Sequence, residues 1–362
     1  MIERFEPAGG GVEGAAWRVA QGLAAAGDDV HVFSRRGTRG DSVTLHSLAV
    51  PSFWQPLRVL AFSLAAAAAT RSGFDVVHSF SRTRHQDVYR AGGGSHADFL
   101  ERAYSPGAAR WRRLSPRHAV LLAMEARIFA DESQLVQCNS EMVRDELQHR
   151  YGIADARLAV LANGVDLERF HPGLRAEHRD ALRRGLGVAE ETPAWLLPGS
   201  GFRRKGVDTA LRALATARDT GELWVVGRDD PAPWRALAAE LGVGDRVRFL
   251  GHRSDMPALY GAADALVLPT RYDAFANVCL EGAACGLPIV TTAANGAARW
   301  LGAAGLTLEN AEDSETLGKL LEELCEPERR SAWGSAARER AETQSWSRHV
   351  AELRDLYARV RR

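Results

Sequence analysis

The chain contains 362 residues, with 46 basic and 46 acidic side chains that give a formal net charge of zero at pH 7. This length is sufficient for two domains with separate hydrophobic cores, and the balanced charge excludes a general attraction to nucleic acid, so no nucleic-acid partner is expected. The four cysteines form no C-x-x-C pair, no apolar segment is long enough to span a bilayer and no secretory signal is visible, which together predict a cytoplasmic protein with buried thiols.

The first motif along the chain is a glycine-rich loop. Gly9, Gly11 and Gly14 match the pattern G-x-G-x-x-G, and the apolar residues after them recur at helical spacing. A dinucleotide-binding loop needs a buried strand in front of it, but residues 1–7 read MIERFEP and predict no strand. The strand predicted at 29–34 is followed by two arginines instead of a ribose-binding acid, which could suit an NADP phosphate. An NADP oxidoreductase is therefore a distant alternative, beside a glycine turn that only begins a helix.

Short apolar runs alternate with amphipathic segments along the rest of the chain. Strands are expected at residues 29–34, 43–50, 75–80, 87–92 and 134–140, and again at 194–200, 222–228, 246–252, 263–269, 288–293 and 305–309. Such alternation predicts an α/β protein with parallel sheets covered by helices. Asn, Gly, Asp and Pro cluster at 161–173, where the series restarts. We therefore expect two doubly wound domains, with a cleft at the carboxyl ends of their strands.

A basic turn follows the first strand of the second half. Arg203, Arg204 and Lys205 come after a glycine-bearing turn and before a predicted helix, whose apolar spacing is set by Val207, Leu211 and Leu214. Backbone N–H groups, the helix dipole and these cationic side chains would converge on one anion, and a phosphate or diphosphate fits best. The alternative is a solvated basic turn.

Two carboxylates separated by seven residues follow a later strand. Asp273 lies in a predicted loop, where it can accept hydrogen bonds from sugar hydroxyls, and Glu281 lies in the next helix, where it can bind a diol such as ribose. The residues that begin this helix can offer backbone N–H groups to phosphate oxygens, and they are Ala274, Phe275, Ala276, Asn277 and Val278. The alternative for Glu281 is an ordinary surface position, which its apolar neighbours disfavour.

The motifs together resemble a known family. The chain carries RRKG at 203–206, the D-x7-E pair with LEGAACGLP at 280–288, NGVDLERFHP at 163–172 and GGGVE at 9–13. In this order they are similar to the retaining glycosyltransferases of family four, which have the GT-B fold, and the resemblance covers nearly the whole chain. Within that family the chain is most similar to the lipopolysaccharide-core glucosyltransferases, through GSGFRRKGVD, GHRSDMPALYGAAD and DVYRAGG.

The resemblance implies an architecture and a reaction. It implies a Rossmann-like acceptor domain at 1–168, a Rossmann-like nucleotide-sugar domain at 169–345 and a final helix at 346–362 that packs back on the first domain. The implied reaction moves a sugar from a nucleotide-diphosphate sugar, with UDP favoured, to a hydroxyl of a glycolipid or polysaccharide in cell-envelope synthesis. The configuration is retained, and neither a metal nor a cofactor is expected. A sugar-nucleotide epimerase and a noncatalytic nucleotide-sugar-binding protein are the alternatives.

The resemblance also implies site residues. Those implied for catalysis are Arg204, Lys205, Asp273 and His96, although His96 has a structural role as an open alternative. Those implied for donor binding are Gly10, Gly11, Ala274, Phe275, Ala276, Asn277, Val278, Glu281, His252 and Arg253. Three features depart from the family pattern: Asp273 replaces the usual glutamate, GSGF at 199–202 lacks the usual arginine, and the first strand is missing.

A basic and aromatic segment spans residues 97–129. Arginines lie there among aromatic and apolar side chains with few acids: Arg102, Arg110, Arg112, Arg113 and Arg117 with Phe99, Tyr104, Trp111 and Leu114. This mixture is typical of a peripheral protein on an anionic bilayer, and a solvated basic face is the alternative. We expect the stretch from Phe99 to Arg117 to contact the inner face of the cytoplasmic membrane.

Overall fold

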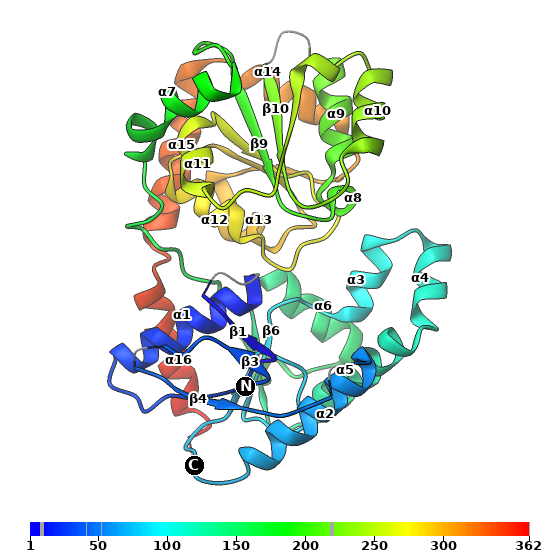
Figure 1. The fold of residues 1–362 in the computed structure, drawn as a ribbon, viewed down its shortest axis with the longest axis vertical. Helices are drawn as coiled ribbons and strands as arrows, with labels where there is room; N and C mark the ends of the chain where they lie inside the picture. The colour runs from blue at the N-terminus through cyan, green and yellow to red at the C-terminus, as the bar shows by residue number, and fades with distance from the viewer. Residues whose placement is uncertain (8–10, 41, 52, 218–220, 362) are drawn as a thin grey trace. The chain divides into compact units, whose positions relative to one another are not determined.

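The computed structural model describes residues 1–7, 11–40, 42–51, 53–217 and 221–361. These residues divide into two compact units, which are Met1–Gly164 with Trp346–Arg362, and Val165–Ser345 (Figure 1). Each unit is built from parallel strands covered by helices, so the predicted α/β class with two doubly wound domains is confirmed. Among the helices described, none is both long enough and apolar enough to cross a bilayer.

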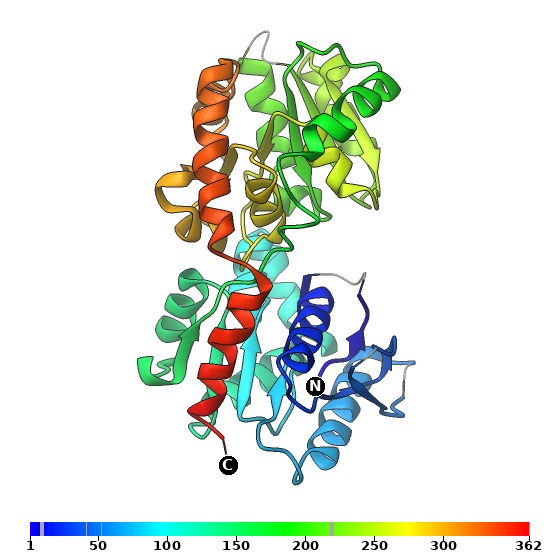
Figure 2. The ribbon, with the colours of Figure 1, turned by 90° about the vertical axis from the view of Figure 1, so that its left-hand side faces the viewer.

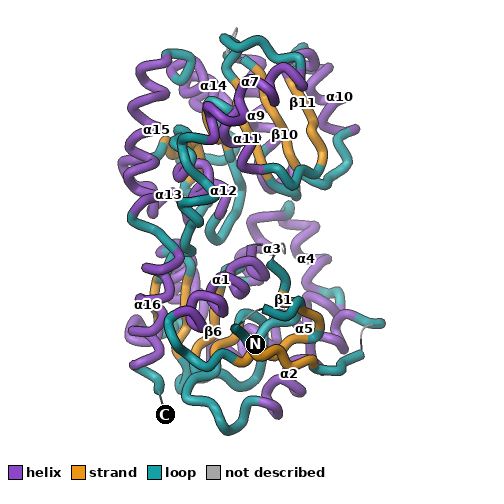
Figure 3. Tube along the Cα trace, turned by 60° about the vertical axis from the view of Figure 1, so that its left-hand side comes forward, coloured by secondary structure: helices purple, strands orange, loops and turns teal. Residues whose placement is uncertain are grey.

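The second unit contains one six-stranded parallel sheet (Figure 3). Its strands are β9 (Ala194–Pro198), β10 (Glu222–Val226), β11 (Val247–Gly251), β12 (Ala265–Val267), β13 (Ile289–Thr292) and β14 (Leu306–Leu308). Their spatial order is β11-β10-β9-β12-β13-β14, so the chain begins in the middle, moves to one edge and then continues on the other side. In such a sheet, ligands bind beyond the carboxyl ends of the strands where the order reverses, which here are β9 and β12.

Helices cover this sheet, and the central strands are buried. The helices are α7 (Leu174–Leu186), α8 (Phe202–Lys205), α9 (Val207–Thr216), α10 (Ala232–Glu240), α11 (Met256–Ala262), α12 (Asn277–Ala284), α13 (Gly296–Leu301), α14 (Ser314–Glu323) and α15 (Pro327–Glu342). Trp195 of β9 and Trp224 of β10 are both fully buried. Continuous apolar runs such as AWLLP form here because a parallel strand is covered on both faces.

The first unit has shorter strands. They are β1 (Arg4–Phe5), β2 (His31–Ser34), β3 (Arg36–Gly37), β4 (Thr44–Ser47), β5 (His78–Ser79), β6 (Val88–Ala91), β7 (Leu135–Cys138) and β8 (Leu158–Val160). β5 to β8 form a four-stranded sheet, β2 pairs with β4, and β1 pairs with β3. The helices are α1 (Gly11–Ala25), α2 (Gln55–Ala69), α3 (His96–Ala103), α4 (Pro106–Arg113), α5 (Pro116–Ala130), α6 (Glu141–Tyr151) and α16 (Trp346–Ala358).

The expectation that the first strand is missing is wrong. The Ile2 amide donates to the Phe33 carbonyl at 3.1 Å, and the Phe80 amide donates to the Met1 carbonyl at 2.8 Å, so the opening segment lies between β2 and β5. Ile2 and Phe5 are buried, at 4% and 1% exposure. The charged residues of this segment argued against a buried strand. Glu3 is nevertheless compatible with one, because it forms an ion pair with Arg58 at 2.8 Å, and Arg58 is too distant in sequence for a local pattern to show this contact.

The last helix belongs to the first unit. In Figure 2, α16 lies beside α1, and both contribute to one apolar cluster with Val19, Leu23, Val350 and Leu353. The Tyr357 hydroxyl of α16 also lies 2.7 Å from Nδ1 of His78. This helix therefore completes the core of the domain that begins the chain, as the GT-B class predicts.

Candidate functional site

The basic turn lies directly beyond the carboxyl end of β9. Arg203, Arg204 and Lys205 form the short helix α8 rather than an open turn. Gly206 joins α8 to α9 with a φ of 77°, and a Cβ there would lie 1.9 Å from the Pro269 carbonyl oxygen. Only glycine permits both the left-handed backbone and this close approach, which holds α8 against the end of the β12 segment.

Asp273 binds both predicted cations. Its Oδ2 accepts from Lys205 Nζ at 2.7 Å and from Arg204 Nη1 at 3.0 Å. Burial alone would raise the pKa of Asp273, but the charges of Lys205 and Arg204 hold it below its ordinary value. The carboxylate is therefore ionised near neutral pH, and it positions two cations at the switch point of the sheet.

The loop that carries Asp273 is fixed by a buried amide. Asn295 is 1% exposed, and its Oδ1 accepts from the Ala276 amide and from the Ala297 amide, both at 3.1 Å. The Gly296 amide donates to the Asp273 carbonyl at 2.9 Å. Asn295 gave no signal in the sequence. The Ala276 amide, predicted to receive a phosphate, is engaged by Asn295 in this structure, and Asn277 and Val278 begin α12.

Glu281 is anchored by a buried tyrosine. Its Oε2 accepts from the Tyr260 hydroxyl at 2.7 Å, and Tyr260 of α11 is 1% exposed. Burial raises the pKa of Glu281 above its ordinary value. Glu281 is therefore not an ordinary surface residue, and Tyr260 is a second residue that the sequence did not reveal.

Another missed residue positions the glycine turn. Asp229 follows β10, and its carboxylate accepts from the Gly201 amide at 2.7 Å and from the Phe202 amide at 3.3 Å. This carboxylate caps the start of α8 and so helps to orient the basic side chains. Its position after the end of a neighbouring parallel strand is the sequence signal that could have identified it.

His252 and Arg253, which the resemblance implies for donor binding, follow β11. Nε2 of His252 lies 3.1 Å from Arg228 Nη2, and Arg253 pairs with Asp255 at 2.8 Å. Both side chains are thus engaged with neighbours at the surface, so their backbone groups are the ones that can contact a donor.

In the first unit, His96 begins α3 and contacts a second histidine. Its Nε2 lies 2.9 Å from Nδ1 of His118, and its amide donates to the buried carboxylate of Glu125 at 2.7 Å. Burial, aided by the charge of Arg82, lowers the pKa of His96 to about 4, so the ring is neutral at pH 7. Gly11 begins α1 and is exposed, whereas Gly10 lies outside the described residues.

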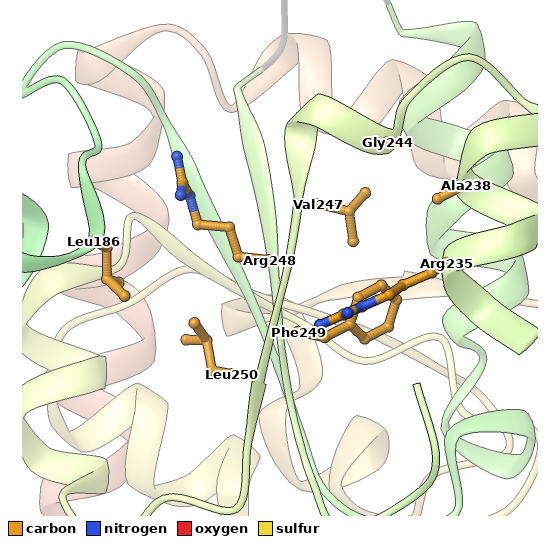
Figure 4. Close-up of a pocket in the computed structure, with 8 residues that line it drawn as sticks. All are labelled: Leu186, Arg235, Ala238, Gly244, Val247, Arg248, Phe249 and Leu250. Atoms are coloured by element: carbon orange, nitrogen blue, oxygen red, sulfur yellow. The ribbon is translucent and has the colours of Figure 1, made fainter. Parts of the chain in front are cut away.

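The structure thus brings Arg204, Lys205 and Asp273 into one cluster beyond β9. Within the described residues, no three His, Cys, Asp or Glu side chains are grouped so that they could hold a metal ion. A pocket of about 460 Å³ lies instead along the edge strand β11, where Arg235, Val247 and Phe249 contribute to its lining (Figure 4). It shares no residue with the cluster at Asp273.

Comparison with known proteins supports the family resemblance. The chain matches Glycosyltransferase Family 4 over residues 9–169 and Glycosyl transferases group 1 over residues 193–326. It is 31% identical over 293 residues to the lipopolysaccharide glucosyltransferase WaaG of Escherichia coli (strain K12). The matched region covers 78% of this chain and 74% of that protein. It is also 32% identical to D-inositol 3-phosphate glycosyltransferase of Saccharomonospora viridis over 250 residues, which span only 57% of that protein.

Solved structures agree with this assignment. The crystal structure of WaaG, a glycosyltransferase involved in lipopolysaccharide biosynthesis, matches with a TM-score of 0.82 at 26% identity and covers 99% of both chains. Anabaena Alr3699/HepE in complex with UDP-glucose matches in fold, with a TM-score of 0.68 at 20% identity over 98% of this chain and 99% of that chain. The resemblance inferred from the motifs is confirmed: the chain belongs to glycosyltransferase family 4, and it is a glycosyltransferase with the GT-B fold.

Proposed function

We propose that the second unit binds a nucleoside-diphosphate sugar, and that the enzyme transfers the sugar to a hydroxyl of a glycan or lipid-linked acceptor. The observation that carries this proposal is the pair of cations, Arg204 and Lys205, held by Asp273 beyond β9. UDP-glucose is the favoured donor, because WaaG is a glucosyltransferase and HepE was solved with UDP-glucose. A lipopolysaccharide or another cell-envelope glycan is the proposed product.

In this proposal the cations stabilise the leaving diphosphate. Negative charge grows on the phosphate oxygens as the bond to the sugar breaks, and preorganised positive charges lower the energy of that transition state. Arg204, Lys205 and the first turn of α12 supply this stabilisation. The acceptor attacks from the face that the diphosphate leaves, and the departing phosphate takes the acceptor proton, so the configuration is retained. No dedicated base, metal or further cofactor enters these steps.

Asp273 and Glu281 contact different parts of the donor. Both ion pairs of Asp273 use Oδ2, so Oδ1 is the oxygen that we assign to a sugar hydroxyl. Glu281, supported by Tyr260, binds the ribose diol. The backbone beside His252 and Arg253 is assigned to the base, and the contact of Gly10, Gly11 and His96 with the donor stays a prediction from the sequence.

We further propose that the first unit docks on an anionic membrane at the cytoplasmic face. Trp111 and Leu114, at the end of α4, are 77% and 72% exposed, beside the exposed Arg110 and Arg112. Further exposed apolar side chains lie at the start and along the outer side of α2, namely Phe53, Trp54, Leu57 and Leu64. Exposed apolar patches next to cationic residues are typical of proteins that bind a bilayer surface.

The test combines binding with product analysis. Calorimetric titration should detect binding of UDP and UDP-glucose, and mass spectrometry should detect sugar transfer to an isolated lipopolysaccharide-core acceptor. Conversion of the donor to another nucleotide sugar without an acceptor would instead indicate an epimerase. Donor binding with neither hydrolysis nor transfer would indicate a noncatalytic nucleotide-sugar-binding protein.

A further inference from the structure

One face of the first unit's sheet changes from apolar to polar toward the carboxyl ends of its strands. On this face Val88 of β6 pairs with Leu135 of β7, and Val88 belongs to the apolar cluster with α1 and α16, against which Leu135 packs. Two residues further along the strands, Arg90 pairs with Gln137. Both are buried, at 3% and 0% exposure, so a polar layer lies inside the domain.

Arg90 is a buried cation without a carboxylate partner in the described part of the chain. Its Nη2 donates to Asn163 Oδ1 at 2.6 Å, and its guanidinium carbon lies 5.2 Å from the centre of the Phe80 ring. Its Nε and Nη1 atoms have no hydrogen-bond partner there. Burial lowers the pKa of Arg90 to about 10, so the side chain still carries its charge at neutral pH. A charge so placed is costly unless something neutralises it.

Unpartnered groups gather around Arg90. Six buried side-chain nitrogen and oxygen atoms without a hydrogen-bond partner among the described residues belong to four residues here, namely Arg90, Gln137, Asn139 and His349. Both amide atoms of Gln137 are included. The four are connected: Asn139 Nδ2 donates to the Gly92 carbonyl at 2.8 Å, and His349 Nδ1 lies 2.7 Å from the carbonyl of Ala162, next to Asn163. Because buried polar groups are normally hydrogen-bonded, such a cluster indicates a missing partner.

The cluster lies where a doubly wound domain binds its ligands, at the carboxyl ends of parallel strands. After Ala91, which ends β6, three glycines follow at 92–94. A Cβ at Gly92 would lie 1.9 Å from Arg90 Nη1, so glycine is needed for the guanidinium to occupy its position. Gly93 is exposed, with open space where its Cβ would be. The unpartnered donors therefore lie directly beneath the surface of this loop.

We propose that this cluster recognises an anionic group on the acceptor, with Nε and Nη1 of Arg90 binding a phosphate or carboxylate and Gln137 and Asn139 binding adjacent hydroxyls. A guanidinium offers parallel N–H groups to two oxygens of one anion. The Gln137 amide supplies a donor and an acceptor together, which matches a hydroxyl group. The assignment of this ligand to the acceptor rests on the proposed transferase function, because the second unit is assigned to the donor.

The test is calorimetric titration of the full chain with inorganic phosphate and, separately, with glucuronate. UDP is kept at saturation, so that phosphate does not report binding at Arg204 and Lys205. The Arg90→Met variant keeps the volume but loses the charge, and it should weaken anion binding by about tenfold or more, because hydrogen bonds to charged groups contribute this much. The matched control Arg71→Met removes an exposed arginine of the same unit and should bind as the unmodified protein does.

Each outcome decides the proposal. Phosphate binding weakened in Arg90→Met but not in Arg71→Met supports a phosphate-bearing acceptor, and the same pattern with glucuronate alone supports a carboxylate. Equal binding by Arg90→Met and the unmodified protein, or no binding of either anion, overturns the proposal. If Arg90→Met fails to fold, Arg90→Lys keeps the charge without the paired N–H geometry and should still weaken binding several-fold. A protein that binds UDP but neither anion refutes only this inference, whereas failure to bind UDP or UDP-glucose refutes the proposed donor site.

Discussion

Two buried arginines, one in each unit, have opposite surroundings. Arg183 of α7 lies 3.1 Å from Asp264, a carboxylate that is also bound by Arg175 and Arg179, whereas among the described residues Arg90 of β6 contacts the neutral amide of Asn163 and the Phe80 ring. The donor site follows the first pattern, because Lys205 is paired with Asp273 before any ligand binds. The second unit therefore positions its charges with internal partners, while the first unit leaves a charge for a ligand to neutralise.

The largest effect should come from removing the internal partner in the second unit. Asp264→Ala would leave three arginines of α7 without their carboxylate, and breaking a buried ion pair in this way costs about 3–5 kcal/mol. Arg90→Met should cost far less, because it replaces an unpaired buried charge with an apolar side chain of similar size. Urea unfolding curves of both variants measure the difference.

Asp245→Ala, at an exposed aspartate of the same unit, is the control for the aspartate change and should leave stability nearly unchanged. If Arg90→Met destabilises the protein as much as Asp264→Ala does, the contrast between the two units is wrong, because Arg90 would then make an equally strong internal contact.

Lowering the pH should remove the stability that the ion pairs of Asp264 contribute. Burial would raise the pKa of Asp264, but Arg179, Arg175 and Arg183 hold it below the ordinary value of 3.8. A carboxylate whose pKa is lower in the folded state stabilises the fold above its unfolded pKa and loses this effect as the pH falls. The stability gap between the unmodified protein and Asp264→Asn should therefore be constant from pH 7 to about pH 5 and narrow below about pH 4. A gap that widens on acidification would contradict the pairing.

Removing a cation from the donor site should affect catalysis more than folding. Lys205→Ala should lower kcat/KM by ~10²-fold or more, because it removes a preorganised charge from the leaving diphosphate. Arg203→Ala is the matched control, since Arg203 lies on the same helix α8 but is exposed. Steady-state kinetics with UDP-glucose measure both. A folded Lys205→Ala enzyme with near-normal turnover would refute the assignment of this lysine.

The basic surface of the first unit should have a smaller and salt-dependent effect. Replacing Arg110, Arg112 and Arg113 with Ser should reduce sedimentation with anionic vesicles about 30-fold, because each free arginine contributes about 1 kcal/mol and Arg113 already pairs with Glu101. Salt should weaken binding of the unmodified protein, and neutral phosphatidylcholine vesicles should capture little of it.

A second triple variant is the control for that experiment, with three exposed arginines of the other unit changed to Ser: Arg184, Arg212 and Arg235. It should sediment as the unmodified protein does. Equal capture by neutral and anionic vesicles, or undiminished capture of the first triple variant, would show that the segment from Phe99 to Arg117 is only a solvated basic face.

Local patterns in the sequence were sufficient for most of the fold. All eleven predicted strands overlap observed ones, because buried parallel strands are continuous apolar runs that a single segment reveals. Val207, Leu211 and Leu214 are fully buried, as their helical spacing predicts. β1 was missed because Glu3 beside it is neutralised by Arg58, which is distant in sequence. β3 and β8 were also missed, and β8 at 158–160 ends directly before the stretch 161–173 that was interpreted as a linker.

The candidate site was predictable only in part, for the same physical reason. Arg204, Lys205 and Asp273 belong to motifs, so the sequence assigned each of them to the donor site, although it did not predict that Asp273 pairs with both cations. Tyr260 and Asn295 act through single contacts, to Glu281 and to the Asp273 loop, that arise only when distant helices and loops pack. Arg90 gives no local signal either, because its unusual feature is the absence of a carboxylate among its neighbours in the described structure.

The smallest effects should separate the two carboxylates of the donor site. Glu281 is anchored by Tyr260 and assigned to the ribose, so Glu281→Gln should weaken binding of UDP and of UDP-glucose alike, by about tenfold. Asp273 is assigned to the sugar and holds both cations, so Asp273→Asn should leave UDP affinity nearly unchanged and reduce transfer. In Asp273→Asn the positive charges of Lys205 and Arg204 are no longer offset, so they still attract the diphosphate. The carboxylate that orients these two cations is lost, however, and transfer should therefore slow. Calorimetry with both ligands measures binding, and single-turnover kinetics measure transfer. If Asp273→Asn weakens UDP binding as much as Glu281→Gln does, the two carboxylates do not divide the donor between them, and the internal pairing at Asp273 would serve nucleotide binding rather than chemistry.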